Sequence, residues 1–438
     1  MKLPEHIHYC IDRLEHAGFA TYAVGGCVRD YLLGLIPHDY DLCTAATPAQ
    51  IKDIFSEHRL VLSGEKHGTI TILLAQPVEI TTFRTEGGYA DSRHPDWVQF
   101  VTDIESDLGR RDFTVNAMAY SPTRGFADPF GGQKDLQNKI LRTVGDPAQR
   151  FTEDALRILR GARFAVRYHL QVEQKTKNTM FQLADRMEGL ARERVFDELC
   201  KLLPLVTAED LLEFAPLLVQ VIPELAPCKD FDQHSPHHAY DVYTHTAQVV
   251  AATPNDLALR WAALLHDVGK PAVFYRDENG RGHFPEHASV GAAMADTVLR
   301  RLRAPNHLRE QVTTLIRHHM TPLPPDKPIL RRRLSKFGQT LWSLLALQKA
   351  DFCSKGVMAE NNEFADTEAL LKEIAAEDAC LHLKDLAVNG RDLMALGFCG
   401  KEVGQCLNNL LAQVLNERLP NEKSTLLKAA EYDREKYL

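Results

Sequence analysis

Apolar and polar residues follow two different periods within the first 140 residues of the chain. Residues 1–20 carry apolar residues at helical spacing, which predicts an amphipathic helix. The stretches "TYAV", "HDYDLCTAA", "GTITILLA" and "VEITTFR" predict strands, and the "QP" between the last two predicts a hairpin. The stretch "TPAQIKDIFSE" predicts a helix, because Thr47 can act as its N-cap and Pro48 suits its first position. These elements indicate a small sheet with helices around it.

The pattern changes at "RFTEDALRILRGARFA", and strand signals nearly vanish from there to the C-terminus. Apolar residues then recur at helical spacing, interrupted by proline-rich joints such as "TPLPPDKP". Neither an internal repeat nor a low-complexity tract is evident. The sequence therefore predicts an α+β protein, in which an N-terminal head of helices and strands precedes a long helical remainder.

Composition narrows the class of protein. The 438 residues suffice for several domains. They contain no apolar run of about 18 residues, which argues against a transmembrane helix, and the N-terminus does not resemble a signal peptide. The nine cysteines are scattered without a C-x-x-C pair, as expected for a cytoplasmic protein without disulfides or zinc ribbons. The net charge of -8 argues mildly against a nucleic-acid partner, but local basic stripes such as "RILRGARFAVR" could still bind phosphates.

Two glycines, an arginine and two aspartates lie close together in "VGGCVRDYLLGLIPHDYDL", residues 24–42. A glycine-rich turn lets backbone N–H groups approach a phosphate, and Arg29 could bind phosphate oxygens in a bidentate manner. Asp39 and Asp41, one residue apart on an expected strand, would face the same side and could hold cations for two-metal nucleotidyl transfer. Glu79 on the later hairpin could be a third metal-facing carboxylate, although an ordinary exposed strand residue is favoured there.

A second charged cluster lies in "LGRRDFTVNAMAY". The apolar residues that follow it suggest that Arg110, Arg111 and Asp112 precede a buried element. An arginine at this position could hold phosphates, and Asp112 could accept a hydrogen bond from a ribose hydroxyl. The alternative is a surface salt bridge, which would contribute little energy.

A third cluster, in "EDALRILRGARF", could recognise a nucleotide base. Its spacing predicts one helix on which Asp154 and Arg157 lie side by side, while Arg163 drifts to another face. A carboxylate only accepts hydrogen bonds and a guanidinium only donates them. Cytosine and adenine both present an amine donor beside a ring-nitrogen acceptor, whereas guanine and uracil present the reverse. The pair therefore predicts selection of CTP and ATP without a nucleic-acid template.

Four motifs, "VGGCVRD", "DYD", "RRDFTVNAMA" and "EDALRILRGARF", resemble in this order the head and neck motifs of class II CCA-adding enzymes (tRNA nucleotidyltransferases) and bacterial poly(A) polymerases. The stretch "FRTEGGYADSRHPDWVQFVTDIESDLGRRDF" resembles the flexible loop of the CCA-adding branch. "ARERVFDELCKLL" resembles the helix after the neck, and "LAVNGRDLMALGFCGKEVGQCLNNLL" resembles the tail motif. The resemblance covers most of the chain outside residues 228–352. It implies a polymerase-β-like nucleotidyltransferase head, a helical neck, body and tail, and magnesium-dependent addition of C, C and A to tRNA.

The same resemblance implies roles for individual residues. Asp39 and Asp41 would bind Mg²⁺ and carry catalysis, and Gly26 and Arg29 would contact the phosphates of CTP or ATP. The remainder of the nucleotide pocket would be formed by Arg111, Asp154, Arg157, Arg160 and Arg163. Candidate tRNA contacts in the tail are Arg391 and Lys401, because lysine and arginine neutralise phosphates.

Residues 237–351 hold a large share of the nineteen histidines, in "HHAYDVYTHT", "LLHDVGK", "HFPEHASVGA", "IRHHM" and "KADFC". The series resembles the HD metal-dependent phosphohydrolases. It implies His245, His266, Asp267 and Asp351 as core ligands, with His287 and either His318 or His319 binding a second metal. Imidazole and carboxylate ligands suit nickel, manganese, cobalt or iron. The alternative is an HD fold that has lost its metal and serves as a tRNA-binding surface.

The expected domains are a nucleotidyltransferase head (1–140), a helical neck with an RNA-binding role (141–227), an HD-like domain (228–352) and a helical tRNA-binding tail (353–438). Expected partners are tRNA, CTP and ATP, without a membrane, and the sequence leaves the oligomeric state open. Alternative functions are poly(A) polymerase, addition of only CC or only A, a mainly HD-based activity, and a non-catalytic RNA-binding regulator. The loop at 84–100 favours full CCA addition, and the presence of Arg29, Asp39 and Asp41 argues against the regulator.

Overall fold

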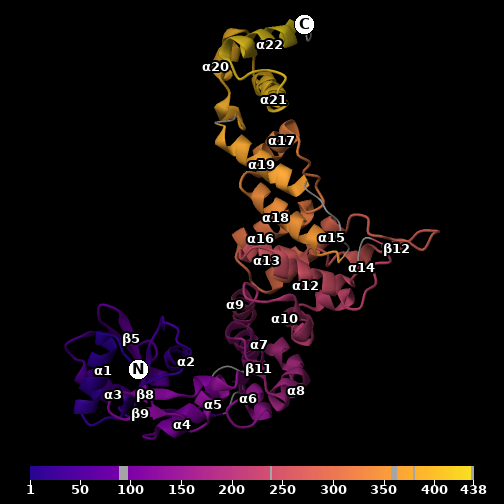
Figure 1. Ribbon diagram of the computed structural model, residues 1–438. Coiled ribbons are helices and arrows are strands. Elements are labelled where there is room, and N and C mark those ends of the chain that lie inside the picture. Colours follow the sequence, from indigo (N-terminus) through magenta and orange to yellow (C-terminus); the bar gives the residue numbers. More distant parts are fainter. Residues whose placement is uncertain (88–96, 237–238, 357–362, 378–379, 436–438) are drawn as a thin grey trace. The chain divides into compact units, whose positions relative to one another are not determined.

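The computed structural model describes the chain except residues 88–96, 237–238, 357–362, 378–379 and 436–438 (Figure 1). The described residues form two compact units. The first contains residues 1–206 and 213–223, and the second contains residues 207–212 and 224–438. A sheet with surrounding helices occupies the first unit and helices dominate the second, which confirms the expected α+β class.

Seven strands form the sheet of the first unit, in the spatial order β3-β4-β5-β2-β1-β8-β9. Their bounds are Thr21–Val24 (β1), Asp41–Thr44 (β2), Arg59–Val61 (β3), Thr69–Leu73 (β4), Pro77–Thr82 (β5), Ala119–Ser121 (β8) and Gly125–Ala127 (β9). Strands β4 and β5 are antiparallel neighbours, as the predicted hairpin requires. Strands β1 and β2 are also antiparallel, with Val24 opposite Asp41. The glycine turn that follows β1 therefore lies at the same edge of the sheet as Asp41.

The expectation that Asp39 lies on a strand was wrong. Strand β2 begins at Asp41, because its partner β1 ends at Val24 and turns into Gly25, which leaves Asp39 without a neighbouring backbone to pair with. Asp39 is an exposed residue of the segment that precedes β2. The predicted flexible loop is flanked by the pair Arg84–Gly87 (β6) and Trp97–Phe100 (β7), and its residues 88–96 lie outside the described part of the chain.

Five helices pack around the sheet: Glu5–His16 (α1), Gly26–Leu32 (α2), Pro48–Ile54 (α3), Ile104–Gly109 (α4) and Gly132–Gln137 (α5). Helix α1 buries Ile7, Ile11 and Leu14, which lie on one face at helical spacing. Thr47 caps α3 in a reciprocal arrangement with Gln50, and Pro48 is the first residue of the helix. Both helices match the predictions from the sequence.

The neck of the first unit consists of Pro147–Glu153 (α6), Leu156–Tyr168 (α7), Gln174–Gln182 (α8), Arg192–Leu202 (α9) and Ala215–Val221 (α11), with a short strand pair Ile140–Leu141 (β10) and Gln171–Val172 (β11). The prediction of one continuous helix through Asp154 was wrong. Asp154 has an extended backbone (φ -145, ψ 103) between α6 and α7. Its carboxylate accepts a hydrogen bond from the N–H of Leu156 at 3.0 Å, so the side chain ends one helix and starts the next.

The second unit is built from helices. Their bounds are Val242–Ala252 (α12), Leu257–Leu265 (α13), Lys270–Val273 (α14), His287–Arg301 (α15), Asn306–His318 (α16), Lys327–Phe337 (α17), Thr340–Cys353 (α18), Glu363–Ala376 (α19), Gly390–Ala395 (α20), Lys401–Leu415 (α21) and Lys423–Glu435 (α22), with α10 at Ala208–Glu213 and a hairpin of Tyr275–Arg276 (β12) and Gly282–His283 (β13). No helix in the described part of the chain is long and apolar enough to cross a membrane.

Candidate functional site

A cavity of about 670 Å³ opens in the first unit between the edge of the sheet, the segment 110–116 and helix α7. Glu79, the weaker candidate for a metal-facing carboxylate, is exposed on β5 and does not line the cavity. The other head and neck residues that were predicted as site residues lie together in its lining. These are Gly26, Arg29, Asp39, Asp41, Arg111, Asp112, Asp154, Arg157, Arg160 and Arg163.

The first glycine of the turn makes room for one of the arginines. Gly25 has φ +73 and ψ -119, a conformation that a side chain disfavours, and a Cβ there would lie 2.7 Å from Nη1 of Arg111. The sequence pointed to Gly26 as the phosphate contact, and the structure adds Gly25 as the position at which a side chain would displace Arg111.

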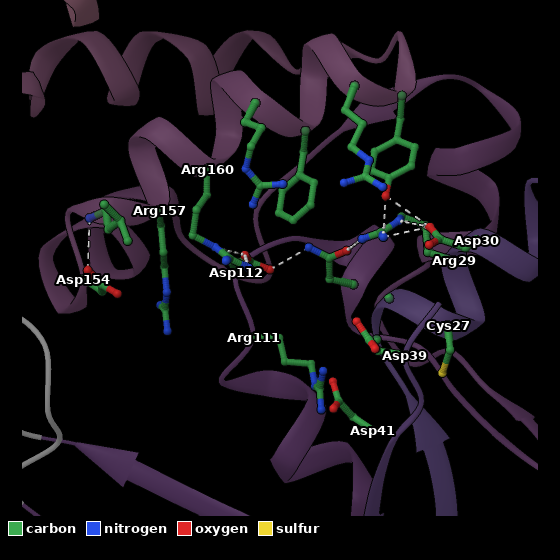
Figure 2. A pocket seen from close by; sticks show the side chains of 18 of the residues that line it. Cys27, Arg29, Asp30, Asp39, Asp41, Arg111, Asp112, Asp154, Arg157 and Arg160 are labelled. Carbon is green, nitrogen blue, oxygen red and sulfur yellow. Dashed lines mark hydrogen bonds and ion pairs between the residues drawn. The ribbon is translucent and has the colours of Figure 1, made fainter. Parts of the chain in front are cut away.

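Asp39 and Asp41 lie at one end of the cavity, where Arg111 points toward Asp41 (Figure 2). The surrounding protein removes part of the hydration of Asp41 and raises the pKa of its carboxyl. Arg111 lowers this pKa and the charge of Asp39 raises it further. The site thus holds two crowded carboxylates near one cationic side chain, which makes it a candidate for binding a divalent cation.

Arg29 is buried and largely committed to protein partners. It donates to Asp30 at 2.9 Å from Nε and 2.8 Å from Nη2, to the Tyr168 hydroxyl at 2.6 Å, and to Asn116. Its guanidinium also lies 4.3 Å from the centre of the Tyr168 ring. Because a guanidinium carries five N–H groups, one remains for a phosphate.

The Asp112 carboxylate, which was predicted to accept a hydrogen bond from a ribose hydroxyl, is held by partners within the protein. One of its oxygens accepts from the N–H of Phe113 and from Asn116, both at 2.9 Å, and the other accepts from Arg160 at 2.9 and 2.6 Å. A carboxylate has about four acceptor positions, and all of them are occupied here.

Asp154 and Arg157 lie together at the other end of the cavity (Figure 2). They come from a helix junction and from α7, respectively, and each is held by other groups. Asp154 is bound by Arg194 of α9, with 2.8 Å between Nη2 and Oδ2. Arg157 donates to Glu153 at 2.7 Å and to the carbonyl oxygens of Arg150 and Arg110 at 3.2 and 3.0 Å.

Arg163 is the member of the α7 series that is turned away from the other two arginines. Its Nε lies 2.5 Å from the carboxylate of Glu198 on α9, and both side chains are buried. This ion pair uses the Nε–H of Arg163 and helps to pack α7 against α9, and Arg163 also lines the cavity.

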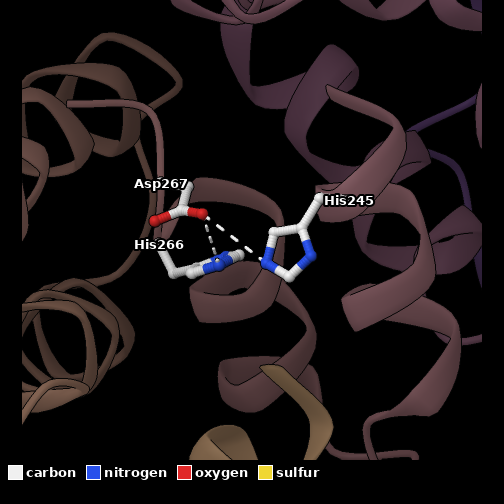
Figure 3. Close-up of side chains that lie close together, drawn as sticks. All are labelled: His245, His266 and Asp267. Atoms are coloured by element: carbon white, nitrogen blue, oxygen red, sulfur yellow. Dashed lines mark ion pairs between the residues drawn. The ribbon is translucent and has the colours of Figure 1, made fainter. Parts of the chain in front are cut away.

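A second candidate site lies in the second unit, where His245, His266 and Asp267 converge (Figure 3). Nε2 of His266 is 3.1 Å, and Nε2 of His245 3.6 Å, from Oδ2 of Asp267. The opposite oxygen of Asp267 lies 3.6 Å from His287 and 4.0 Å from His319. The two groups, His245–His266–Asp267 and Asp267–His287–His319, are buried and share one carboxylate.

The rings of this second site are oriented by the backbone. Nδ1 of His266, His287 and His319 each lies 2.7–2.8 Å from a carbonyl oxygen three residues earlier, and Nδ1 of His245 lies 3.2 Å from the carbonyl of Ser354. This arrangement directs every Nε2 toward Asp267, as in metal-binding histidines.

Burial and the attraction between neighbouring groups shift the pKa values of the second site. Burial lowers the pKa of His287 and lowers that of His319 to about 4. The mutual attraction of Asp267 and His266 outweighs burial, lowering the pKa of the carboxyl and raising that of the ring.

Of the two alternative ligands, His318 and His319, only His319 lies with Asp267 and His287. His319 is buried in the cluster, whereas the His318 ring packs against Phe337 at 4.9 Å between centroids. Asp351 lies at the margin of the cluster, with its Oδ1 3.0 Å from Nε2 of His245.

Glycines allow the elements of this second site to approach closely. A Cβ on Gly269 would lie 2.5 Å from the carbonyl oxygen of His287 and 2.7 Å from the N of Gly291. The backbone after Asp267 can therefore contact the first turn of α15, which begins at His287.

Several residues of the first cavity were not predicted from the sequence. Asn116, Tyr168 and Arg194 line it and bind Arg29 or Asp154. In the sequence, Arg194 is one of several charged residues of the "ARERVFDELCKLL" motif. Its four-residue spacing to Glu198 indicates that the two side chains share one face of a helix, and this was the only sign of their common role.

Family models match three parts of the chain. Residues 21–142 match the poly A polymerase head domain, residues 169–229 match a probable RNA and SrmB-binding site of polymerase A, and residues 286–430 match a putative tRNA nucleotidyltransferase domain 2.

Curated relatives extend the similarity to the whole chain. A CCA-adding enzyme of Levilactobacillus brevis is 34% identical over 442 residues, which cover 98% of each chain. A CCA-adding enzyme of Limosilactobacillus fermentum is 50% identical over 194 residues, or 44% of this chain, and in that alignment the chain spans about half (48%) of the relative's length.

Solved structures agree with these relatives. The crystal structure of Bacillus stearothermophilus CCA-adding enzyme in complex with CTP is 27% identical, with a TM-score of 0.71 and full coverage of both chains. Thermotoga maritima CCA-adding enzyme complexed with tRNA-CCA is 20% identical, with a TM-score of 0.60 over 99% of this chain and 96% of that one, and supports the fold alone.

Proposed function

The chain belongs to the family of CCA-adding enzymes, and on this premise we propose that it adds C, C and A to the 3′ end of tRNA from CTP and ATP without a nucleic-acid template. The observation that carries the proposal is the cavity that has Asp39 and Asp41 at one end and Asp154 with Arg157 at the other. A nucleoside triphosphate that spans this cavity would present its phosphates to the carboxylate end and its base to the opposite end.

The base end selects the nucleotide by hydrogen-bond polarity. Asp154 can only accept, and Arg157 can only donate. Cytosine and adenine offer the complementary donor and acceptor, whereas uracil and guanine would leave buried polar groups unpaired. The bonds of Arg157 to Glu153 and to two backbone carbonyls keep its guanidinium in place before the nucleotide arrives.

The phosphate end has the donors that a triphosphate requires. Arg29 and Arg111 line the cavity near the glycine turn, where helix α2 begins at Gly26 and leaves backbone N–H groups unpaired within the helix. Arg160 neutralises Asp112 and so keeps a further negative charge away from the phosphates. These groups would hold the triphosphate with its α-phosphate near Asp39 and Asp41.

The two carboxylates fit Mg²⁺. They are oxygen ligands of like charge, and both are accessible from solvent. Burial, and to a smaller extent the charge of Asp39, raises the pKa of Asp41, and a bound cation would favour its charged form. Bound divalent cations would supply charge stabilisation at the attacking and leaving oxygens of nucleotidyl transfer. Asp39 and Asp41 would hold them, and Arg111 would orient the phosphate beside them.

Incubation with a tRNA that lacks its 3′ CCA, in the presence of labelled CTP or ATP separately and together, tests the proposal. Incorporation of two C residues and one A supports it. Long A tails without CTP dependence would indicate a poly(A) polymerase, and addition of only CC or only A would indicate a partial enzyme. The absence of incorporation of either nucleotide would leave the non-catalytic regulator as the better account.

A second activity is favoured by the histidine cluster around Asp267. Four imidazoles with inward Nε2 atoms and a shared buried carboxylate fit a transition metal such as nickel, manganese, cobalt or iron better than magnesium, which prefers oxygen ligands. Such a metal would lower the pKa of a coordinated water and provide a nucleophile for phosphoester hydrolysis.

This second activity is a phosphohydrolase acting on small nucleotides or on the 2′,3′-cyclic phosphate of a damaged tRNA end. The choice of substrate rests on analogy with the HD family. Metal analysis of the purified protein and hydrolysis assays with each added metal test it. A chain without bound transition metal and without hydrolysis would indicate an HD fold kept for its helices.

A further inference from the structure

Arg194 and Glu198 lie four residues apart on α9 and form one charged face toward α7 and its start. Each is paired with a residue of opposite charge in the segment 154–163. Arg194 binds Asp154 at 2.8 and 3.4 Å, and Glu198 binds Arg163 at 2.5 Å. Helix α9 therefore carries charges opposite to those of this segment, and its Arg194 holds Asp154, the hydrogen-bond acceptor, from one side.

The acceptor positions of Asp154 show what Arg194 leaves open. Oδ1 accepts from the N–H of Leu156 at 3.0 Å and from Nη1 of Arg194 at 3.4 Å. Oδ2 accepts from Nη2 of Arg194 at 2.8 Å. Because a carboxylate has about four acceptor positions, one position on Oδ2 remains, and both Asp154 and Arg194 line the cavity.

We propose that Arg194 is a specificity-determining residue: it fixes the Asp154 carboxylate in one orientation, with a single acceptor position directed at the amine of cytosine or adenine. The inference rests on the proposed function, because it assumes that Asp154 and Arg157 read the base. Arg194 is a positioning residue, since it acts through Asp154.

Asp154 and Arg157 are the accepting and donating halves of the proposed base reader, and each half is held in position by different partners. Arg157 is held by Glu153 and by backbone carbonyls of Arg150 and Arg110, none of which involves Arg194. Loss of Arg194 therefore releases the accepting half and leaves the donating half in place. A released carboxylate can rotate away from the carbonyl of uracil. The kcat/KM for UTP should therefore rise relative to that for CTP.

The test compares Arg194→Gln and Arg194→Lys with the matched control Arg192→Ala. Arg192 is on the same helix and donates to the exposed carbonyl of Glu188 at 2.9 Å. For each full-length variant, kcat/KM is measured for CTP, ATP, UTP and GTP on tRNA lacking CCA, together with the melting temperature and inhibition by inorganic tripolyphosphate.

The proposal expects Arg194→Gln to lower the CTP-to-UTP ratio of kcat/KM by at least about tenfold, with inhibition by tripolyphosphate unchanged. Arg194→Lys should recover part of the ratio, because lysine keeps the charge without the bidentate fork. Arg192→Ala should match the wild type.

Two results would overturn the inference. A folded Arg194→Gln variant with wild-type nucleotide ratios would show that Asp154 needs no such support, and an equal loss with all four nucleotides would indicate a structural role alone. Failure of the proposed function would look different, since the wild-type protein itself would then show no preference for CTP and ATP.

Discussion

The guanidinium of Arg160 on α7 binds the carboxylate of Asp112 in the head, with Nη2 2.6 Å and Nε 2.9 Å from the same oxygen. The other oxygen of Asp112 is occupied by Asn116 and by the N–H of Phe113. This ion pair ties the segment that precedes β8 to the helix that carries Arg157. It fixes one wall of the cavity.

Replacement of Asp112 by Asn should destabilise the fold in a pH-dependent way. Burial alone would raise the pKa of Asp112, but Arg160 and Asn116 outweigh it and lower the pKa from 3.8 to about 2. A carboxyl whose pKa is lower in the folded state stabilises above its unfolded pKa, and this contribution is lost as pH falls from about 4 to about 2. Asp112→Asn should cost on the order of 2 kcal/mol of unfolding free energy at neutral pH.

Chemical denaturation of both proteins at neutral pH and at about pH 3 measures this difference. The difference in unfolding free energy between the wild type and Asp112→Asn should be smaller at the lower pH. A gap that stays constant across the two conditions would show that the ion pair with Arg160 is not its source.

Asp39→Asn and Asp41→Asn should each abolish nucleotide addition, because an amide loses the charge that holds a divalent cation. The loss should be at least about a hundredfold in kcat with magnesium as the metal. Asp53→Asn is a matched control, since Asp53 is an exposed aspartate of α3 in the same head. Near-normal turnover in the two site variants would remove them from catalysis, provided that their melting temperatures equal that of the control.

Gly25→Ala should weaken nucleotide binding by displacing Arg111, whose Nη1 would lie 2.7 Å from the new Cβ. KM for CTP and ATP should rise by about tenfold or more. Gly400→Ala is the matched control: Gly400 also precedes a helix, with φ 53 and ψ -120, and a Cβ there meets nothing within 4 Å. If both variants change the melting temperature alike but neither changes KM, then Gly25 serves the backbone and not Arg111.

His319→Ala should remove transition metal from the second unit, whereas His318→Ala should retain it. The two histidines are neighbours in sequence, but only His319 joins Asp267 and His287 in the buried cluster. Metal content measured after purification, together with phosphoester hydrolysis, distinguishes them. Both variants should add CTP to tRNA at the wild-type rate, and equal metal loss in the two would count against the cluster as the binding site.

The sequence predicted the composition of the nucleotide cavity better than its geometry. Short motifs predicted Asp41, Arg111 and Arg157 as members of one site, because a triphosphate and a base require these residue types, and all three line the cavity. Helical spacing failed at Asp154, since its side chain bonds to the N–H of Leu156 and breaks the helix at that residue. A local competition between side-chain and backbone hydrogen bonds is not visible in apolar periodicity.

Contacts between distant segments were the part that the sequence could not supply. The bond of Arg29 to Tyr168 and that of Arg194 to Asp154 join residues 139 and 40 positions apart. Motif spacing does not show which residues of such pairs will meet, because that depends on how α2 and α9 each lie against α7 and the residues before it. The saturation of Asp112 was missed for the same reason, since Arg160 comes from another element.

The most direct test of the account is sequencing of tRNA 3′ ends after incubation with equal concentrations of CTP, ATP, UTP and GTP. The account predicts that the wild-type protein adds C, C and A to a tRNA lacking them and then stops. Asp154→Ala, which removes the accepting half of the base reader, should incorporate UTP and GTP at the same positions while still binding triphosphate. Wild-type fidelity in a folded Asp154→Ala variant would contradict the claim that this cavity selects the nucleotide through Asp154 and Arg157.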